Sequence, residues 1–340
     1  MTDRRLPTLF SLAAADALGA ATEFKTPQVI RARYGESITT YQPGSVFGFA
    51  PGEATDDTQM VAATLLGYAR GGGLVGVLAG LHEWLRAGPP DVGGLTREAL
   101  RSGELGDGQP DGGVRAWQSG GFQSAGNGGL MRIAAAWLVG LEGAALARES
   151  ALVTALTHAD PRCVHASVFF TAFLEALAGD MAYRDAAESG LRVMDGLDAR
   201  AALLDAGLLG IDTRAAFDAF GKPDRAARAE VRARVRRGLE GHVTSQSGYV
   251  LDTLEAAVAH ARADTWQDAV EPAVLGGDDA DTVACVVGAI IGARGLRLPE
   301  HLRPDLRLGH SWPGWDRAWA ATAHFPALLA DAQAAVAKWA

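Results

Sequence analysis

The segment from Thr282 to Ala293 constrains the fold of this 340-residue chain more than any other. Its large apolar residues recur at helical spacing, and they are Val283, Val286, Val287, Ile290 and Ile291. A helix that is apolar nearly all round offers no face to water, so it has to lie inside the protein. The segment therefore predicts a central buried helix.

The rest of the chain has the same helical character, because Ala and Leu dominate and period-two alternation is scarce. The other clear helical windows are Thr58–Arg70, Leu74–Ala87, Leu130–Val139, Ala145–Leu156, Cys163–Ala178, Tyr249–Ala263 and Arg317–Trp339. We find no repeat of fixed period and no low-complexity linker. These patterns predict an all-α protein, and the length allows one large domain or two small ones.

Composition narrows the range of partners. The chain is 48% hydrophobic and carries a net charge of −9, which argues against broad binding to nucleic acid or to anionic membranes. The only cysteines, Cys163 and Cys285, lie in apolar surroundings, so we expect a reduced, cytoplasmic location. The apolar stretch from Leu9 to Ala21 is interrupted by Asp16 and Gly19, which excludes a signal peptide or a membrane span there.

Three segments depart from the helical pattern. Glycine-rich loops are expected at Gly88–Gly94, continuing through Gly103–Gly113, and at Gly120–Gly129. The segment Asp195–Glu240 is less apolar and holds a run of arginines: Arg225, Arg228, Arg232, Arg234, Arg236 and Arg237. A solvated helical face explains such a run most simply, and a surface for an acidic partner is the alternative.

Two acidic clusters lie more than two hundred residues apart, and an apolar helical pattern follows each. The first is Thr55-Asp56-Asp57-Thr58, and the second is Asp278-Asp279-Ala280-Asp281-Thr282. Carboxylates this dense repel one another unless a cation neutralises them. Oxygen ligands without His or Cys beside them favour Mg²⁺, Mn²⁺ or Ca²⁺ over Zn²⁺. Brought together, the two clusters would hold a pair of divalent cations.

Helix capping is the simpler explanation of either cluster alone. Asp and Thr are preferred N-caps, and Asp56 with Gln59 resembles a capping box. A capping aspartate still presents its second oxygen to a metal, so the two explanations are compatible. Capping does not explain three consecutive oxygen-bearing residues at 55–57, and the second cluster lacks the glycine and distant glutamate of an EF-hand loop.

Further residues have chemical potential and simpler structural explanations. Gly126-Asn127-Gly128-Gly129-Leu130-Met131-Arg132 is predicted to open a helix, where backbone N–H groups favour a phosphate, although glycine serves any tight turn. His158 suits a helix end, and Tyr249 is a base-stacking or a core residue. Asp16 and Glu23 flank a glycine turn, where a carboxylate could be an acid/base group, a metal-shell residue or a helix cap. Asp91 is most simply a loop residue.

Taken in order, these segments resemble the ADP-ribosylglycohydrolase family, and most closely its dinitrogenase-reductase-activating branch because of the doubled aspartate at 278 and 279. The matching segments run from about residue 10 to about residue 295. They are Asp16–Phe24, Thr55–Met60, Pro90–Gly93, Gly126–Arg132, Thr157–Asp160, Gly248–Leu254 and Gly277–Thr282. Each is moderately specific, and seven in register are highly specific.

The resemblance implies a single compact orthogonal helical bundle over residues 1–340, with two Mg²⁺ or Mn²⁺ ions at the base of a cleft. It implies metal ligation by Thr55, Asp56, Asp57, Asp279, Asp281 and Thr282. Glu23 and Asp91 would be the catalytic carboxylates beside the metals and the scissile bond. The substrate-binding residues would be Gly126, Asn127, Gly128, Gly129, Met131, His158, Gly248 and Tyr249.

The activity that the resemblance implies is hydrolysis of a glycosyl bond, with release of ADP-ribose from a modified protein and arginine linkage favoured. Alternatives are O-linked, nucleic-acid-linked or free ADP-ribose derivatives, and a non-catalytic ADP-ribose-binding protein. All six ligand positions carry oxygen donors, which favours an enzyme. Two departures from the family pattern, Arg294–Leu302 and a branch-specific segment near 195–240, bear on substrate choice and leave the metal ligands untouched.

Overall fold

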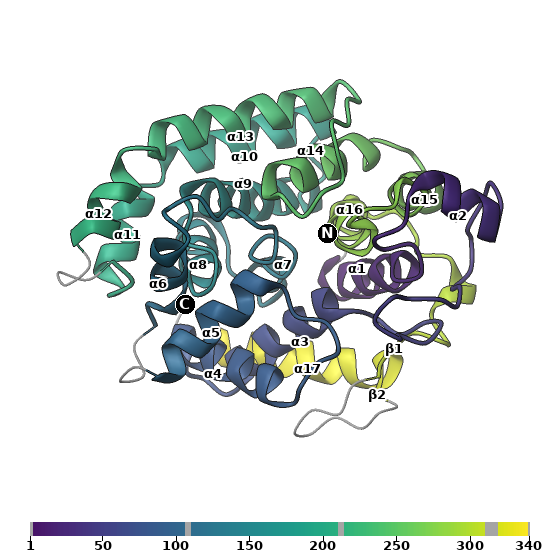
Figure 1. The fold of residues 1–340 in the computed structure, drawn as a ribbon, viewed down its shortest axis with the longest axis horizontal. Helices are drawn as coiled ribbons and strands as arrows, with labels where there is room; N and C mark the ends of the chain where they lie inside the picture. Colours follow the sequence, from purple (N-terminus) through teal and green to yellow (C-terminus); the bar gives the residue numbers. More distant parts are fainter. Residues whose placement is uncertain (1–2, 106–109, 210–213, 310–318, 339–340) are drawn as a thin grey trace.

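The computed structural model describes residues 3–105, 110–209, 214–309 and 319–338, and nearly all of its regular structure is helical (Figure 1). The helices are α1 Arg5–Gly19, α2 Pro27–Tyr34, α3 Asp56–Ala69, α4 Gly73–Arg86, α5 Gly94–Leu105, α6 Gly112–Ser119, α7 Ala134–Leu138, α8 Gly143–Ala155, α9 Pro161–Ala178, α10 Tyr183–Gly196, α11 Ala199–Asp205, α12 Arg214–Gly221, α13 Asp224–Leu239, α14 Val250–His260, α15 Trp266–Gly276, α16 Ala280–Arg294 and α17 Ala321–Val336. A 3₁₀ helix covers Glu300–Leu302, and the short strands β1 Arg307–Leu308 and β2 Trp319–Ala320 pair antiparallel. The prediction of an all-α protein is confirmed.

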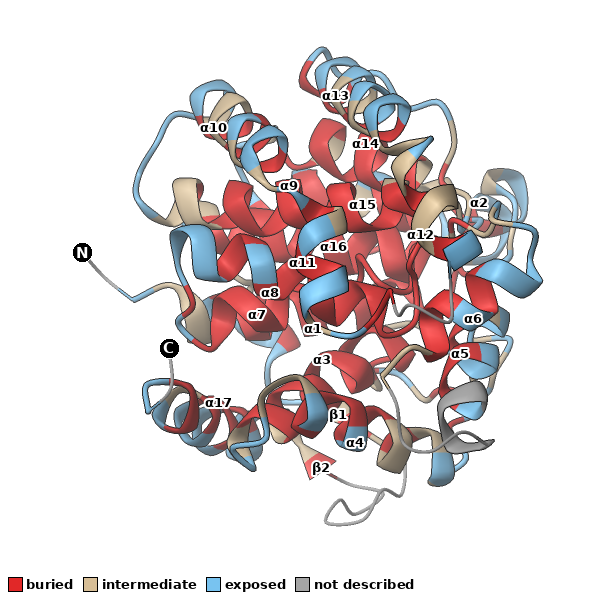
Figure 2. Cartoon of the chain, turned by 90° about the vertical axis from the view of Figure 1, so that its left-hand side faces the viewer, coloured by how far each residue is buried: buried red, intermediate tan, exposed pale blue. Residues whose placement is uncertain are grey.

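Helix α16 forms the centre of the fold, as the apolar segment predicted. Every residue from Ala280 to Ala293 is buried, and Figure 2 shows the helix inside the molecule. Helix α1 packs along it closely. A Cβ atom on Gly288 would lie 2.8 Å from Leu12 Cα, and one on Gly292 would lie 2.7 Å from Thr8 Cα. Only glycine permits this approach between two backbones.

The remaining helices surround this pair. Helix α3 packs against α4 and α17, while α9 contacts α8, α10 and α13, and α14 and α15 cover another side of α16. Helices α10 and α13 lie at the periphery and present exposed faces (Figure 2). Among the described residues, no helix has both the length and the apolar character needed to cross a membrane. The division of the chain into domains stays a prediction.

Three predicted boundaries differ from the structure. The helix expected over Leu130–Val139 is only α7, Ala134–Leu138, because the Gly126–Gly129 turn continues as irregular backbone up to Ile133. The long loop expected after Gly88 contains helix α5, which buries Thr96, Ala99 and Leu100 at helical spacing. The last predicted helix is α17, and its predicted ends, Arg317 and Trp339, lie outside the described residues.

Candidate metal centre and cleft

The first acidic cluster begins helix α3, and a buried aspartate of α1 supports it. The hydroxyl of Thr55 caps the helix by accepting from the backbone N–H of Asp57 at 3.4 Å. Asp16 accepts from the backbone N–H groups of Thr55 and Thr58, each at 3.1 Å, and from both hydroxyls. Burial raises the pKa of Asp16 to about 6, although these hydrogen bonds act to lower it. Asp16 therefore fixes the start of α3 to α1.

The capping box expected from Asp56 and Gln59 does not form. Thr55 is the N-cap, and Gln59 Oε1 accepts instead from the indole Nε1 of Trp84 at 2.9 Å. Capping thus uses a hydroxyl, so the carboxylates of Asp56 and Asp57 remain available to the cavity that they line.

The second acidic cluster follows a left-handed turn that is paired with the turn after α1. Gly277 and Asp278 have φ values of 69° and 56°, in the left-handed region that few residues other than glycine adopt readily. The backbone N–H of Asp278 donates to Lys25 O at 3.1 Å, and that of Phe24 donates to Asp278 O at 2.7 Å. This pairing brings Glu23 next to Asp279 and Asp281.

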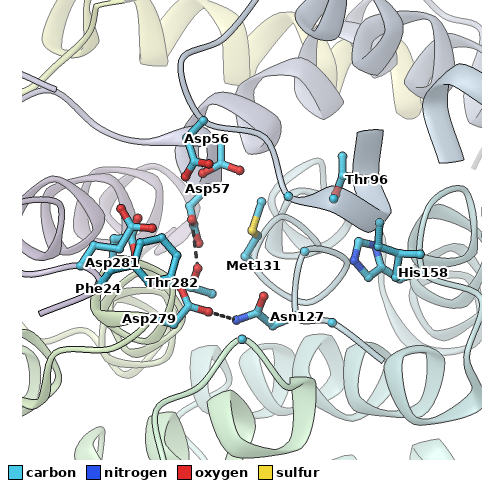
Figure 3. A pocket seen from close by; sticks show the side chains of 18 residues that line it. Phe24, Asp56, Asp57, Thr96, Asn127, Met131, His158, Asp279, Asp281 and Thr282 are labelled. Atoms are coloured by element: carbon cyan, nitrogen blue, oxygen red, sulfur yellow. Dashed lines mark hydrogen bonds between the residues drawn. The ribbon is translucent and has the colours of Figure 1, made fainter. Parts of the chain in front are cut away.

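The two clusters meet, as the sequence predicted (Figure 3). Carboxylate oxygens of Asp56, Asp57 and Asp281 lie within 4.8 Å of one another, and so do those of Glu23, Asp279 and Asp281. Asp281 belongs to both groups. The hydroxyl of Thr282 donates to Asp57 Oδ2 at 3.2 Å and thus bridges the clusters. Two adjacent groups that share one carboxylate are the arrangement that a pair of cations requires.

The donor set fits hard divalent cations. Asp57 Oδ1, Asp281 Oδ1 and Glu23 Oε2 are buried and have no hydrogen-bond partner among the described residues. A buried carboxylate oxygen without a donor is costly, and a bound cation would satisfy all three. Both groups consist of carboxylates alone, which suits Mg²⁺ or Mn²⁺ better than Zn²⁺.

The pKa values report the same crowding. Burial, followed by the charges of Asp281 and Asp91, raises the pKa of Glu23 to about 11. Burial and neighbouring carboxylates also hold the pKa values of Asp56, Asp57 and Asp281 well above their usual range. The same burial and crowding disfavour the ionised carboxylates unless a cation is bound, so metal binding competes with protons.

Metal binding is expected to stabilise the fold more near neutral pH than in mild acid. Burial raises the pKa of Asp279 to about 6, against hydrogen bonds from Asn127 and Thr282 that lower it. A raised carboxyl pKa contributes stability below the unfolded value of about 4, and the metal-free protein loses that contribution as pH rises through the folded value. We expect Mn²⁺ to raise the Tm more at about pH 7.5 than at about pH 5. Thermal unfolding with Mn²⁺ or EDTA tests this, and equal shifts at both pH values would contradict it.

The carboxylates form one end of a cavity of about 280 Å³. Its lining residues are Glu23, Phe24, Asp56, Asp57, Asp91, Gly93, Gly94, Leu95, Thr96, Gly126, Asn127, Gly128, Met131, His158, Gly248, Asp279, Asp281 and Thr282. The predicted residues Thr55, Gly129 and Tyr249 are not among them: Thr55 and Gly129 lie buried behind the wall, and the Tyr249 hydroxyl is 3.4 Å from Arg162 Nη1. Their roles, and those of the lining residues, stay predictions.

The glycine-rich loop borders the cavity beside His158, and its Asn127 reaches Asp279 (Figure 3). A Cβ on Gly128 would lie 2.8 Å from His158 Cε1 and 3.1 Å from Thr96 Oγ1, so a side chain there would collide with the wall. The expectation that this loop opens a helix is wrong, because α7 begins only at Ala134. A helix dipole therefore does not explain an affinity of this loop for phosphate.

A buried arginine supplies positive charge near the loop instead. Arg132 is fully buried and donates to the backbone oxygens of Gly128 and Val153 and to the hydroxyl of Thr157. Burial lowers its pKa to about 9, which still leaves it charged at neutral pH. Sequence reasoning quoted Arg132 in the motif but gave it no role, since burial of a charged side chain is not readable from spacing.

His158 is a neutral member of the cavity wall. Burial, with the nearby charge of Arg132, holds its pKa well below the usual range. Its Nδ1 lies 2.8 Å from the hydroxyl of Thr157, which also contacts Arg132. The ring can therefore exchange hydrogen bonds with a ligand but brings no charge.

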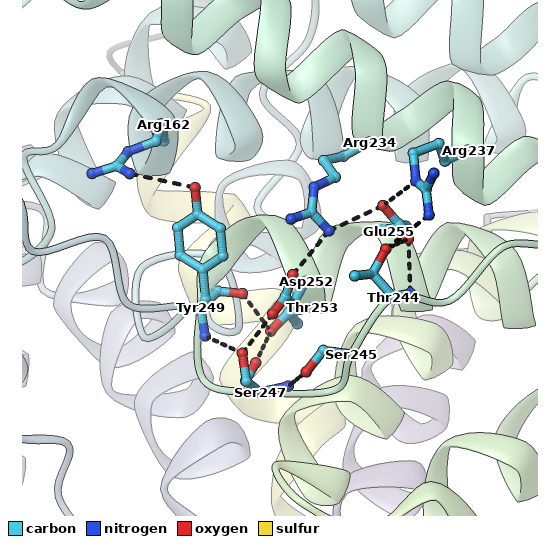
Figure 4. A network of polar contacts seen from close by, with 10 residues as sticks. All are labelled: Arg162, Arg234, Arg237, Thr244, Ser245, Ser247, Tyr249, Asp252, Thr253 and Glu255. Carbon is cyan, nitrogen blue, oxygen red and sulfur yellow. Dashed lines mark hydrogen bonds and ion pairs between the residues drawn. The ribbon is translucent and has the colours of Figure 1, made fainter.

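Arginines of the basic helix α13 pair with the connecting segment, residues 244–255, whose backbone contacts both Asp279 and Asn127 (Figure 4). Arg234 lies 2.9 Å from Asp252 and 3.1 Å from Glu255, and Arg237 lies 3.2 Å from Glu255. Glu255 is fully buried and also accepts from the backbone N–H of Thr244 at 2.8 Å. Although burial acts to raise the pKa of Glu255, these hydrogen bonds lower it.

This network reaches the second acidic cluster through the backbone. Gln246 O accepts from the N–H of Asp279, and Gly248 O accepts from the N–H of Asn127, both at 3.0 Å. Asn127 Nδ2 in turn donates to Asp279 Oδ2 at 2.6 Å. Arg234 is thus largely covered and pairs with carboxylates of α14, which a solvated face does not predict, whereas Arg237 is exposed as predicted and also pairs with Glu255.

Replacing Arg234 with methionine is expected to loosen this connection. The change leaves Asp252 without its arginine and Glu255 with Arg237 alone, so we expect a loss of about 2–3 kcal/mol in unfolding free energy, together with weaker binding of ADP-ribose. Urea unfolding and calorimetry measure both. Arg236→Met is the matched control, because the Arg236 side chain is 57% exposed and its ion pair with Glu188 is long, at 3.8 Å. Equal effects of the two changes would contradict a specific role.

The helical fold and the buried carboxylate groups together place this protein in the class of all-α proteins that have a carboxylate cluster in a cavity. The chain belongs to the ADP-ribosylglycohydrolase family, whose profile matches residues 1–335, and it is a hydrolase of glycosyl bonds. A solved structure titled ADP-ribosylglycohydrolase-related protein complex shares the fold, with a TM-score of 0.66, 24% identity and coverage of 98% of each chain.

Three curated proteins show what this chain is similar to. ADP-ribosylarginine hydrolase Tri1 of Pseudomonas putida (strain GB-1) is 29% identical over 86% of this chain and 70% of its own length. Tri1 of Serratia proteamaculans (strain 568) is 29% identical over 86% of this chain and 71% of its own. ADP-ribosyl-[dinitrogen reductase] glycohydrolase of Rhodospirillum rubrum is 36% identical over 29% of this chain and 34% of its own.

Proposed function

We propose that this chain removes ADP-ribose from an arginine side chain of a modified protein, using two divalent cations. The observation that carries the proposal is the cavity that joins two carboxylate groups, centred on Asp281, to a glycine-rich loop near the buried Arg132. The similarity to two ADP-ribosylarginine hydrolases favours the arginine linkage. The substrate partner is then an ADP-ribosylated protein, and the cytoplasm remains the proposed location.

The carboxylates would divide between two ions. Asp56, Asp57 and Asp281 would hold one, while Glu23, Asp279 and Asp281 would hold the other. Thr55 and Thr282 lie beside them as further oxygen donors. When bound, such ions orient ribose hydroxyls and water and lower the pKa of that water.

The other end of the cavity would bind the ADP portion. The backbone N–H group of Gly128, which lines the cavity, has no acceptor among the described residues, so it is free to donate to a diphosphate. Arg132 adds positive charge behind it. Binding energy from this remote portion positions the ribose at the carboxylates.

Bond cleavage then needs two proton transfers, one away from the attacking water and one to the departing guanidine. Water oxygen bonds to the anomeric carbon as the carbon–nitrogen bond to arginine breaks, through an oxocarbenium-like transition state. Asp91, which lies in the cavity wall outside both metal groups, would accept the proton of the water, and Glu23 is the alternative through a carboxylate oxygen that holds no ion. The departing guanidine nitrogen takes up a proton, so that the products are ADP-ribose and unmodified arginine.

The test is hydrolysis of arginine-, serine- and DNA-linked ADP-ribose, each with Mg²⁺, Mn²⁺ or EDTA. We expect release of ADP-ribose from the arginine-linked substrate, and only with metal. Turnover of serine- or DNA-linked substrate alone would replace the linkage that we propose. Binding of ADP-ribose without turnover of any substrate would favour a non-catalytic protein, and turnover in EDTA would exclude the metal role.

A further inference from the structure

Phe24 is an exposed aromatic residue at the carboxylate end of the cavity. Its side chain is 63% exposed, although its neighbours Glu23 and Ala21 are buried. Figure 3 shows it at the same end as Asp281, away from His158. Phe24 also lines a second cavity of about 660 Å³, so it stands where the two cavities adjoin.

The backbone holds this ring in place at a conformational cost. Phe24 has a φ of 53°, in the left-handed region that a bulky residue rarely adopts. Its N–H donates to Asp278 O at 2.7 Å, which fixes the turn to the start of the second acidic cluster. Strained, exposed residues that the surrounding structure holds in place cluster at functional sites.

The ring of Phe24 is largely open to solvent. The contact with Phe47 is edge-on, with ring centroids 6.0 Å apart and planes at 67°. No arginine or lysine of the described residues stacks on Phe24. The adjacent Lys25 directs its ammonium group to Gly44 O at 3.0 Å.

The walls around Phe24 favour a cation. Of the described residues, six carboxylates and no lysine or arginine line the first cavity, and the two proposed metal ions would offset four of those charges. In the second cavity, Asp278 is exposed beside Phe24, and Lys25 is the only lysine or arginine among the described residues of its wall. A planar guanidinium suits both an aromatic face and a carboxylate.

We propose that Phe24 is a specificity-determining residue that stacks on the guanidinium of the ADP-ribosylated arginine, with the second cavity receiving the peptide that carries it. This inference rests on the proposed function, because it needs the scissile bond to lie at the carboxylate end. There the group attached to the anomeric carbon lies next to Glu23, and therefore next to Phe24. A serine linkage has no charge or plane for the ring to contact.

The test compares Phe24→Leu, which keeps an apolar side chain but removes the aromatic face, with Phe24→Tyr, which restores it. With Phe24→Leu we expect the KM for an ADP-ribosylarginine peptide to rise about fivefold to tenfold, with a smaller change in kcat. The affinity for free ADP-ribose, which has no guanidinium, should stay unchanged. Phe24→Tyr should restore the KM.

A matched control is Phe122→Leu, since Phe122 also has a left-handed φ of 63° but packs on Trp117 at the wall of a third cavity. Its KM for the arginine peptide and its affinity for ADP-ribose should both be those of the wild type. An unchanged KM for the arginine peptide in Phe24→Leu overturns the inference. A loss of affinity for ADP-ribose as large as the rise in KM also overturns it, because it would place the ring on the ribose. Wild-type protein without activity on arginine-linked substrate would instead overturn the proposed function.

Discussion

Replacing Asp281 with asparagine is expected to abolish hydrolysis while the protein stays folded. Asp281 is the one carboxylate that belongs to both candidate metal groups, so its loss weakens both sites together. We expect kcat to fall by more than about a thousandfold with saturating Mn²⁺. In EDTA the Tm should stay equal or rise, because burial, followed by the charge of Asp279, raises the pKa of this carboxyl, and an amide is neutral at every pH.

The control for this change is Asp264→Asn, which makes the same substitution at a side chain that is 99% exposed. Activity assays and thermal unfolding in EDTA separate the two expectations. Normal turnover by Asp281→Asn would remove the dinuclear centre from the mechanism. A large fall in Tm without metal would show that the carboxylate supports the fold rather than an ion.

Changing Gly19 to alanine is expected to damage the metal centre from outside it. A Cβ atom there would lie 2.5 Å from Asp281 Cα and 2.8 Å from Ala280 O, which are backbone atoms that cannot rotate away. Helix α1 or α16 has to shift, and we expect a loss of about 1–3 kcal/mol in unfolding free energy. Because the shift moves Asp281, Mn²⁺ affinity should fall about tenfold or more.

Gly196→Ala is the matched control, since a Cβ atom at Gly196 would meet nothing within 4 Å. Urea unfolding and calorimetric titration with Mn²⁺ measure the two effects for both variants. A Gly19→Ala protein with wild-type affinity for Mn²⁺ would mean that α1 and α16 can separate without disturbing the ligands. If Gly19→Ala is less stable than Gly196→Ala but binds Mn²⁺ as tightly, the role of Gly19 is confined to packing.

The local patterns of the sequence predicted eight of the described helices, namely α3, α4, α7, α8, α9, α14, α16 and α17, but not all of their ends. The apolar surface of α16 is continuous, so its burial follows from the residues themselves. The helical spacing in α5 was hidden by the glycines around it. The irregular backbone before α7 is accompanied by hydrogen bonds from Arg132 to a carbonyl of its own loop and to one of α8. Boundaries that depend on distant partners cannot be predicted from spacing.

For the site, the sequence determined the donors and the structure decided their arrangement. The types and order of Asp56, Asp57, Asp279 and Asp281 were enough to predict an oxygen-rich centre, because ligand chemistry depends on residue type. That Asp281 belongs to both groups, that Phe24 stands exposed between two cavities and that Arg234 secures the connecting segment were decided only by tertiary packing. These features depend on distances between segments far apart in the chain, and such distances are set by the way the helices pack.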